Sequence, residues 1–286
     1  MVRFHAHPPP MTFPYFSKNG KMLPISEAHV SLSNIEYSYG FGVYETIRVN
    51  NKIPYFLKEH LERLELSAKT IGLDHIFNTD QITEWVSDFI EKISEATFNL
   101  KLLLIGAVKK EDAQIFILAS SPLFPERKWF KEGIKTITLK YERYWPHAKT
   151  LNMLGSYIAY KKAKENGCYD ALLINRREEI TEGTRTNVYF VKGSTLYSPP
   201  SSDILLGVMR MVLLRLIQAS KIGFRQVCIP YKDISKFDGA FLTSTSSKIL
   251  PIKQIDDYYF GEIPSLTRNL MKKLNEYLDM CKGILR

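Results

Sequence analysis

The sequence predicts an α+β (α/β) protein of two domains, and three observations carry this prediction. The chain has 286 residues, whereas a single domain typically contains about 100–200. Hydrophobic residues make up 45% and charged residues 24%, which allows a buried core and excludes a disordered or collagen-like chain. Strand-like alternation and helix-like periodicity recur in both halves, as in proteins that mix helices and strands around each core.

The first half begins with a loose tail over residues 1–10 and a hairpin turn at Gly20. Alternating residues in YGFGVYETIRVN predict a strand over 39–50, with a turn at Asn50-Asn51. An apolar stripe and a closing glycine predict a helix over 57–72. A second helix is expected to be capped by Thr79.

Apolar runs at 100–107 and 113–120 predict two further strands. The polar segment SSPLFPERK follows them, and its two prolines indicate a linker. We therefore divide the chain into an N-terminal α/β domain at 1–120, a linker at 121–130 and a C-terminal domain at 131–286.

The second half alternates short strands with helices. Asn152 is expected to cap the first helix and Gly167 to end it. The expected strands lie at 134–143, 171–175, 187–191, 195–198, 226–230 and 239–243, and the expected helices at 152–166, 207–220 and 265–285.

Composition limits the classes of partner. The formal net charge is +9, but the lysines are scattered and form no basic patch interleaved with aromatics, so we expect no nucleic-acid binding. A basic surface can still attract phosphates and carboxylates. No run approaches about 18 apolar residues, so no membrane span is expected.

Cysteine and histidine spacing excludes two further classes. Cys168, Cys228 and Cys281 form no CxxC pair, and the six histidines show no metal-ligand spacing. We expect neither disulfides nor a metal, and a cytoplasmic, reducing location. The N-terminus, MVRFHAHPPP, lacks the apolar segment of a secretory signal.

Common nucleotide, hydrolase and metalloprotease motifs are absent, which leaves lysine, arginine, carboxylate and hydroxyl chemistry. Lys149 lies in HAKTLNMLGSY, at the end of a strand-like run and before a helix. A single lysine is usually a surface residue. A desolvated lysine can instead attack a carbonyl and form a Schiff base.

Three other positions have both an ordinary and a functional interpretation. Glu182 lies between two expected strands, as a turn residue or as a carboxylate that holds a proton on a heterocyclic nitrogen. The hydroxyl-rich segment at 242–247 is a plain loop or a phosphate cradle. Arg63 pairs with Glu59 or Glu62 on its own helix, or binds an anion.

The order of these features resembles fold-type IV pyridoxal-phosphate enzymes, the class IV aminotransferase family. That family includes branched-chain aminotransferase, D-amino acid aminotransferase and aminodeoxychorismate lyase. The resemblance spans about Phe16 to Ile255 and includes YGFGVYETIRV, EHLERLELSAKTIGL, ITEGTRTNVYFVK, ILLGVMR and FLTSTSSKILPI. The matching positions, in chain order, are Arg63, Lys149, Glu182, Gly207–Arg210 and Thr243–Ser247.

The resemblance implies a smaller N-terminal α/β domain, a larger C-terminal domain with a barrel-like sheet, and pyridoxal 5′-phosphate between them. It also implies a homodimer. Lys149 matches the lysine that forms a Schiff base with the cofactor, Glu182 the acid at the pyridine nitrogen, and Arg63 the phosphate-binding arginine. Further matches are Thr245, Ser246, Val208 and Met209 at the phosphate, Leu205 on the ring face, Thr186 and Asn187 on the wall beside the acid, and Tyr44 on the substrate side.

The chain departs from the family pattern at three places. Met209 stands where a threonine is common, and Phe41 where an acid is common. The segment LLLIGAVKKEDAQIFIL lacks the arginine that binds the substrate carboxylate in D-amino acid aminotransferase. We expect Lys109, Lys110, Arg185 or the partner subunit to supply that charge.

The resemblance leaves three functions open. The first is a ping-pong aminotransferase that moves an amino group between an amino acid, branched-chain, aliphatic or of D configuration, and a 2-oxo acid. The alternative is aminodeoxychorismate lyase, which releases pyruvate and 4-aminobenzoate. The third is a binding protein with a vestigial site, against which the joint presence of Arg63, Lys149 and Glu182 argues.

Overall fold

The computed structural model describes residues 13–31, 34–122 and 124–284, and the chain divides into two compact units. Unit 1 comprises Met1–Leu123 together with Ala148–Asn152, and unit 2 comprises Phe124–His147 and Met153–Arg286. We call Ala148–Asn152 the return segment. It brings Lys149 into unit 1, whereas the sequence pattern suggested the second domain. The expected tail at 1–10 lies outside the described residues.

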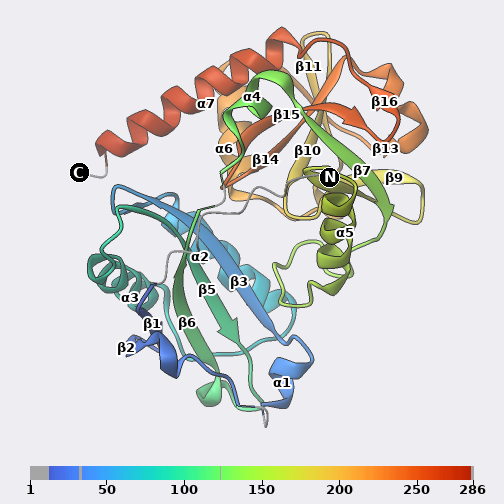
Figure 1. The fold of residues 1–286 in the computed structure, drawn as a ribbon. Helices are drawn as coiled ribbons and strands as arrows, with labels where there is room; N and C mark the ends of the chain where they lie inside the picture. The colour runs from blue at the N-terminus through green and yellow to red at the C-terminus, as the bar shows by residue number, and fades with distance from the viewer. Residues whose placement is uncertain (1–12, 32–33, 123, 285–286) are drawn as a thin grey trace, which may run out of the picture. The chain divides into compact units, whose positions relative to one another are not determined.

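Unit 1 is built on an antiparallel sheet with the strand order β2-β1-β6-β5-β3-β4 (Figure 1). Its strands are β1 (Tyr15–Lys18), β2 (Lys21–Pro24), β3 (Gly42–Asn50), β4 (Ile53–Pro54), β5 (Thr97–Ile105) and β6 (Gln114–Ser120). Gly20, with a φ of 84°, forms the predicted first turn. The turn after β3 lies at Asn51 and Lys52, which have φ values of 52° and 65°, one residue later than expected.

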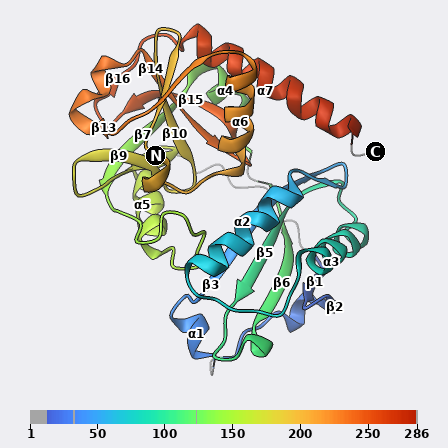
Figure 2. The same cartoon turned by 180° about the vertical axis from the view of Figure 1, so that it is seen from behind.

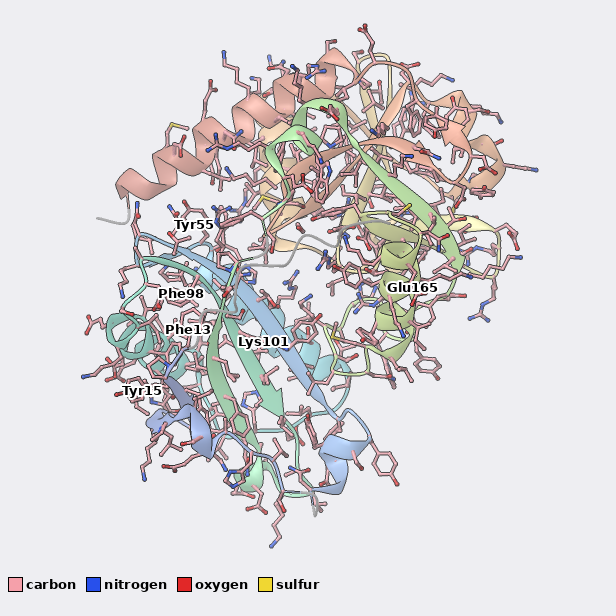
Figure 3. All side chains as sticks on the ribbon, viewed as in Figure 1. Phe13, Tyr15, Tyr55, Phe98, Lys101 and Glu165 are labelled. Carbon is pink, nitrogen blue, oxygen red and sulfur yellow. The ribbon has the colours of Figure 1, made fainter. Side chains whose placement is uncertain are left out.

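Two helices, α2 (Leu57–Thr70) and α3 (Thr79–Lys92), cover one face of this sheet (Figure 2). Unit 1 also contains the short helix α1 (Ile35–Ser38). The cap of α3 is Asn78, whose side chain accepts a hydrogen bond from Gln81 N at 2.8 Å, so the prediction of Thr79 as the cap is wrong by one residue. The core beneath the helices includes Phe13 and Phe98, whose ring centroids lie 6.0 Å apart (Figure 3).

The ten-stranded sheet of unit 2 has the order β12-β11-β10-β14-β15-β7-β8-β9-β13, with β16 paired to β15, and it curls into a half-barrel (Figure 1). The strands are β7 (Ile134–Lys140), β8 (Asp170–Ile174), β9 (Glu179–Gly183), β10 (Asn187–Lys192), β11 (Thr195–Ser198), β12 (Gly223–Gln226), β13 (Ile229–Pro230), β14 (Gly239–Ser244), β15 (Lys248–Ile255) and β16 (Tyr258–Tyr259). The α+β class is therefore confirmed.

The described part of unit 2 also contains the α-helices α4 (Arg127–Glu132), α5 (Leu154–Glu165), α6 (Val208–Ala219) and α7 (Ser265–Ile284). Helix α4 begins inside the expected linker. Met153, with no side-chain hydrogen bond, stands at the cap of α5, so the expected cap at Asn152 is wrong. No helix of the described residues is both long and apolar enough to cross a bilayer.

Strand β9, like β15, is an element that the sequence pattern did not predict. Its sequence, EITEG, has a single large apolar residue, yet four of its five residues are buried. It pairs with β8 in antiparallel register, with Leu172 opposite Gly183. Glu182 therefore lies within a buried strand and not in a connection between strands.

Candidate active site

Lys149 is held against the edge of β3 by backbone hydrogen bonds. Tyr44 N donates to Lys149 O at 2.9 Å, and Leu151 N donates to Gly42 O at 2.8 Å. A Cβ on Gly42 would lie 2.7 Å from Leu151 Cδ1 and 2.8 Å from the carbonyl oxygen of Leu104. Glycine at position 42 therefore allows the return segment to reach the strand.

Helix α2 holds Lys149 from a second direction. Ser67, fully buried, accepts a hydrogen bond from Lys149 N at 3.0 Å and donates one to Arg63 O at 2.7 Å. The Lys149 amine lies 4.4 Å from the centroid of the Tyr44 ring. The ring face attracts a cation, so both the backbone and the amine of this lysine have defined positions.

Arg63 on α2 pairs with Glu45 on β3, a partner that spacing along one helix does not predict. Arg63 Nε and Nη2 donate to the two Glu45 carboxylate oxygens at 2.7 Å each, and His60 Nδ1 lies 2.7 Å from Oε2. His60 and Arg63 are three residues apart on α2, so they project from one face. The Glu45 and His60 side chains are completely buried, and that of Arg63 is 10% exposed.

The protonation states of this group follow from its contacts. Burial by itself would raise the pKa of Glu45, but the charge and hydrogen bonds of Arg63 and His60 outweigh it and lower this pKa to about 2. Burial lowers the pKa of His60 below its usual 6.5, although Glu45 opposes the shift. Glu45 is therefore ionised and His60 neutral, with Nδ1–H as the donor to the carboxylate.

Lys101 on β5, labelled in Figure 3, is a candidate that sequence reasoning missed. Its amine lies 5.6 Å from the centroid of the Tyr44 ring, so two lysines flank this ring. Lys101 is opposite Thr46 in the register of β3 and β5, and its side chain is exposed. An exposed lysine on a central strand gives no signal in a single sequence, because its partner Tyr44 is distant along the chain.

In unit 2, Glu182 is 3% exposed and bound on both oxygens. Arg143 Nη1 donates to Oε1 at 3.4 Å, and Leu205 N donates to Oε2 at 3.2 Å. Arg143 also lines a cavity of about 250 Å³, together with Thr181 from the same strand as Glu182. The carboxylate is thus oriented by two donors that the sequence pattern did not connect with it.

Asn187 positions the start of α6. Its Nδ2 donates to Leu205 O at 2.8 Å, and a Cβ on Gly207 would lie 2.3 Å from its Oδ1. Gly207 is the cap residue of α6 but supplies no side-chain hydrogen bond to the first turn. The amides of Val208 and Met209 therefore begin a helix that has no side-chain cap. Such a helix start is suited to binding an anion. The side chains of both residues are buried.

The turn between β14 and β15 lies beside Asn187. Thr243 is directly opposite Asn187 in the strand register, and its Oγ1 is buried without a hydrogen-bond partner. The hydroxyls of Ser244 and Ser247 are 2.7 Å apart and close the turn, which leaves Thr245 and Ser246 at its tip, half-buried. A buried hydroxyl without a partner costs about 1–3 kcal/mol, so a polar ligand at this position is favoured.

The neighbouring residues Arg185 and Thr186 differ in their environment: the Thr186 side chain is buried, and the Arg185 side chain is exposed. The buried Asp170 carboxylate accepts hydrogen bonds from Thr184 Oγ1 at 2.5 Å and Thr186 Oγ1 at 2.9 Å. Arg185, between these threonines, is exposed and stacks on Tyr160, with its guanidinium carbon 4.2 Å from the ring centroid. The Thr186 hydroxyl thus fixes the β9–β10 connection, and the Arg185 side chain packs against Tyr160 of α5.

One group of potential metal ligands occurs among the described residues: Glu179, Asp203 and Cys228, with ligand atoms within 4.8 Å of one another. Arg177 is ion-paired to both carboxylates, at 2.8 Å and 2.9 Å. The single positive charge of Arg177 is shared between the two carboxylates, and we assign no metal here.

The amino-transferase class IV family model matches residues 42–255. D-alanine aminotransferase from Bacillus licheniformis is 30% identical over 267 residues, which cover 90% of this chain and 94% of that protein. The branched-chain amino acid aminotransferase structure from Escherichia coli has a TM-score of 0.83 at 24% identity and covers 90% of this chain and 92% of its own. The branched-chain aminotransferase structure from Thermoproteus uzoniensis, solved with norvaline, has a TM-score of 0.81 at 23% identity, with coverages of 91% and 92%.

The structural likenesses confirm the fold-type IV architecture that the motif order predicts. Class IV aminotransferases use pyridoxal 5′-phosphate, and another structurally similar branched-chain aminotransferase was solved with pyridoxamine 5′-phosphate. Because the family model extends from β3 to β15 and the relative at 30% identity covers nine-tenths of the chain, this protein is an enzyme of the class IV aminotransferase family.

Proposed function

We propose that the protein moves an amino group between an amino acid and a 2-oxo acid with pyridoxal phosphate, and that Lys149 is the residue to which the cofactor attaches. The observation that carries this proposal is the placement of the Lys149 amine over the Tyr44 ring, with its backbone bound to both β3 and α2. A primary amine held in this way suits attack on an aldehyde and, once released, proton transfer.

The residues present fit the cofactor. The start of α6, without a side-chain cap, and the unpartnered hydroxyl of Thr243 fit a phosphate group. We propose that Thr245, Ser246 and the amides of Val208 and Met209 bind this phosphate. Arg63 is proposed as a phosphate ligand from its match to the arginine of the family. Glu182 would hold a proton on the ring nitrogen, and Leu205, Thr186 and Asn187 would line the ring.

When bound, pyridoxal phosphate supplies an electron sink for the electron pair that remains when the Cα–H bond breaks. The chain's own residues then have separate tasks. Lys149 moves a proton to and from Cα. The Glu182 carboxylate is oriented by Arg143 and Leu205, so it is positioned before a ligand arrives. Tyr44 forms part of the substrate side.

We propose that the Lys101 amine binds the substrate carboxylate. It lies against the same ring as Lys149, whereas Arg185 stacks on Tyr160. Among the described residues, the lysines at the Tyr44 ring are Lys101 and Lys149, and not Lys109 or Lys110. Donors of the branched-chain, aliphatic or D-amino acid classes all carry this carboxylate.

We further propose that the enzyme is a cytoplasmic homodimer. Helix α5 buries Ala159 and Ala163 but exposes Leu154, Tyr157 and Ile158 by 67%, 60% and 55%. An apolar stripe of this kind suits burial against a second copy. Sedimentation equilibrium, with charged substitutions at Tyr157 and Ile158, tests the assembly.

The visible spectrum of the protein with pyridoxal phosphate tests the activity, before and after a panel of D- and L-amino acids. We expect a yellow protein that one class of amino acid converts to the pyridoxamine form. A yellow protein that no amino acid changes, but that releases pyruvate from aminodeoxychorismate, would be the lyase. A protein that stays colourless contradicts the assignment of Lys149.

A further inference from the structure

We infer that Glu45 is a positioning residue for Arg63: it fixes the plane of the guanidinium, and a neutral His60 holds Glu45 in turn. The inference deepens the proposed function and rests on it, because it takes Arg63 as a ligand of the cofactor phosphate. Neither Glu45 nor His60 touches the reacting atoms in this assignment. Both act through Arg63.

The geometry restricts the arginine strongly. Two hydrogen bonds of 2.7 Å join Nε and Nη2 to the two Glu45 oxygens, so the guanidinium and the carboxylate share a plane. Nε and Nη2 form one edge of the guanidinium, and the Nη1 amino group lies on another. An arginine whose guanidinium is already held in one plane loses little further rotamer freedom when it binds an anion.

His60 is the third point of attachment. Its Nδ1 lies 2.7 Å from Glu45 Oε2, and its Nε2 is buried without a hydrogen-bond partner. A protonated ring would place an N–H at that position with nothing to accept it. The charged groups that act on His60 are Glu45, Arg63 and Lys149, and the last two oppose protonation.

The charges therefore balance within the group. Glu45 carries one negative charge, Arg63 one positive charge, and His60 none. The three side chains together carry no net charge, so their long-range attraction for a phosphate is small. The affinity for phosphate then depends mainly on the fixed orientation of the Arg63 guanidinium. A purely structural ion pair would stabilise unit 1 without any preference for phosphate-bearing ligands.

The experiment compares binding of pyridoxal phosphate and of pyridoxal, which lacks the phosphate, by equilibrium titration of absorbance. We expect Glu45→Gln to weaken pyridoxal phosphate about tenfold, the effect of one lost charge-assisted hydrogen bond, and to leave pyridoxal nearly unchanged. Glu142→Gln is the matched control, because it removes the carboxylate of an exposed ion pair with Arg176. Equal weakening of both compounds, or of neither, overturns the inference.

A double variant tests whether Glu45 acts through Arg63. Arg63→Met alone leaves a buried carboxylate without its cation, so Arg63→Met with Glu45→Gln is the better-folded comparison. We expect the double variant to bind pyridoxal phosphate no more weakly than the single arginine variant. Additive losses contradict the positioning role, and if the single variant does not fold, the ratio of the two ligands for Glu45→Gln decides.

The tautomer of His60 provides an independent readout. With an ionised Glu45, Nδ1 carries the proton. Nε2 is buried without a hydrogen-bond partner, so it should carry no proton in the wild-type protein. Nitrogen-15 NMR of the wild-type imidazole should therefore show the neutral Nδ1–H tautomer, and a protonated ring or an Nε2–H tautomer contradicts the inference.

The two levels of interpretation can fail separately. If the wild-type protein does not bind pyridoxal phosphate, or if Lys149→Ala still captures it covalently after borohydride reduction, the proposed function fails. If the wild type captures it and Glu45→Gln retains the same preference for the phosphate, only the inference about Glu45 fails.

Discussion

The Lys149 amine lies 4.4 Å from the centroid of the Tyr44 ring, and the two residues are also joined through the backbone, from Tyr44 N to Lys149 O at 2.9 Å. The amine and the ring therefore share one anchor on β3. A displacement of the strand would move both residues together, which preserves their spacing.

Replacing Tyr44 by leucine removes the aromatic face below the amine, whereas Tyr44→Phe keeps it. A cation–π contact contributes about 0.5–2 kcal/mol, so we expect Tyr44→Leu to slow covalent capture of pyridoxal phosphate several-fold. Stopped-flow absorbance measures this rate. Equal rates in the leucine and phenylalanine variants would show that the ring face has no part in holding the amine.

Ser67→Ala should loosen the return segment, because the Lys149 amide loses its acceptor inside a buried region. We expect the free energy of unfolding to fall by about 1–3 kcal/mol, with faster hydrogen exchange at the Lys149 amide. Ser87→Ala is the control, since the exposed Ser87 donates its hydrogen bond within its own helix, to Thr83 O at 3.0 Å. Similar exchange at Lys149 in both variants would argue against the Ser67 anchor.

Glu182→Gln keeps the shape of a side chain that is bound by Leu205 N and Arg143 but removes its charge. In the role proposed for Glu182, this charge keeps the ring nitrogen protonated, so its loss should weaken the cofactor as an electron sink. We expect the amino-acid half-reaction to slow about 100-fold or more, with the cofactor still bound. Glu179→Gln, in the same strand, should retain its rate, and a fast Glu182→Gln enzyme would refute the assigned role.

Lys101→Met tests the proposed carboxylate contact. Because the Lys101 amine is exposed and faces the Tyr44 ring, its loss should raise KM for the amino donor about tenfold, as for one charge-assisted hydrogen bond. Affinity for pyridoxal phosphate should not change. Lys109→Met serves for comparison, and a larger effect there than at position 101 would reassign the contact to the β5–β6 connection.

Acid should destabilise the fold in two stages. Unfolded His60 takes up a proton below its usual pKa of 6.5, whereas the buried ring, whose pKa is lowered, does not. The unfolded state then binds more protons, so stability falls as pH drops below 6.5. Glu45, whose pKa is about 2 in the folded protein against 4.5, adds a second loss as pH falls from 4.5 toward 2.

Urea unfolding at a series of pH values measures both stages. The contribution of Glu45 above pH 4.5 corresponds to about 3 kcal/mol. In Glu45→Gln the lower stage should be reduced by about this amount relative to wild type, and in His60→Asn the upper stage should disappear. A wild-type profile that is flat from pH 7 to 4 would contradict the protonation states assigned to this group.

Helices and strands whose apolar residues recur at a regular spacing could be predicted from the sequence. Helices α2 and α3 and strands β3, β5 and β6 have apolar residues at spacings that match their buried faces, and each was predicted near its observed bounds. Strand β9 was not, since its buried residues include Thr181 and Glu182, which are polar. Burial of polar residues depends on partners elsewhere in the fold, and a local pattern does not contain them.

The same limit applies to the candidate site. Lys149, Glu182 and Arg63 could be selected from motif order, but their roles remain predictions. Spacing along one helix offers Glu59 and Glu62 as candidate partners of Arg63. Glu45 lies on β3, and the fold of the sheet against α2 brings it to Arg63.

The return segment has a consequence for how the chain is made. Unit 1 cannot be completed when its first 123 residues have left the ribosome, because Ala148–Asn152 must still be synthesised, after the first strand of unit 2. The chain from Phe124 to His147 forms a loop whose closure carries an entropic cost. The lysine-bearing segment is thus the last part of unit 1 to take its place, so a nascent chain acquires its reactive amine only after synthesis of the second unit has begun.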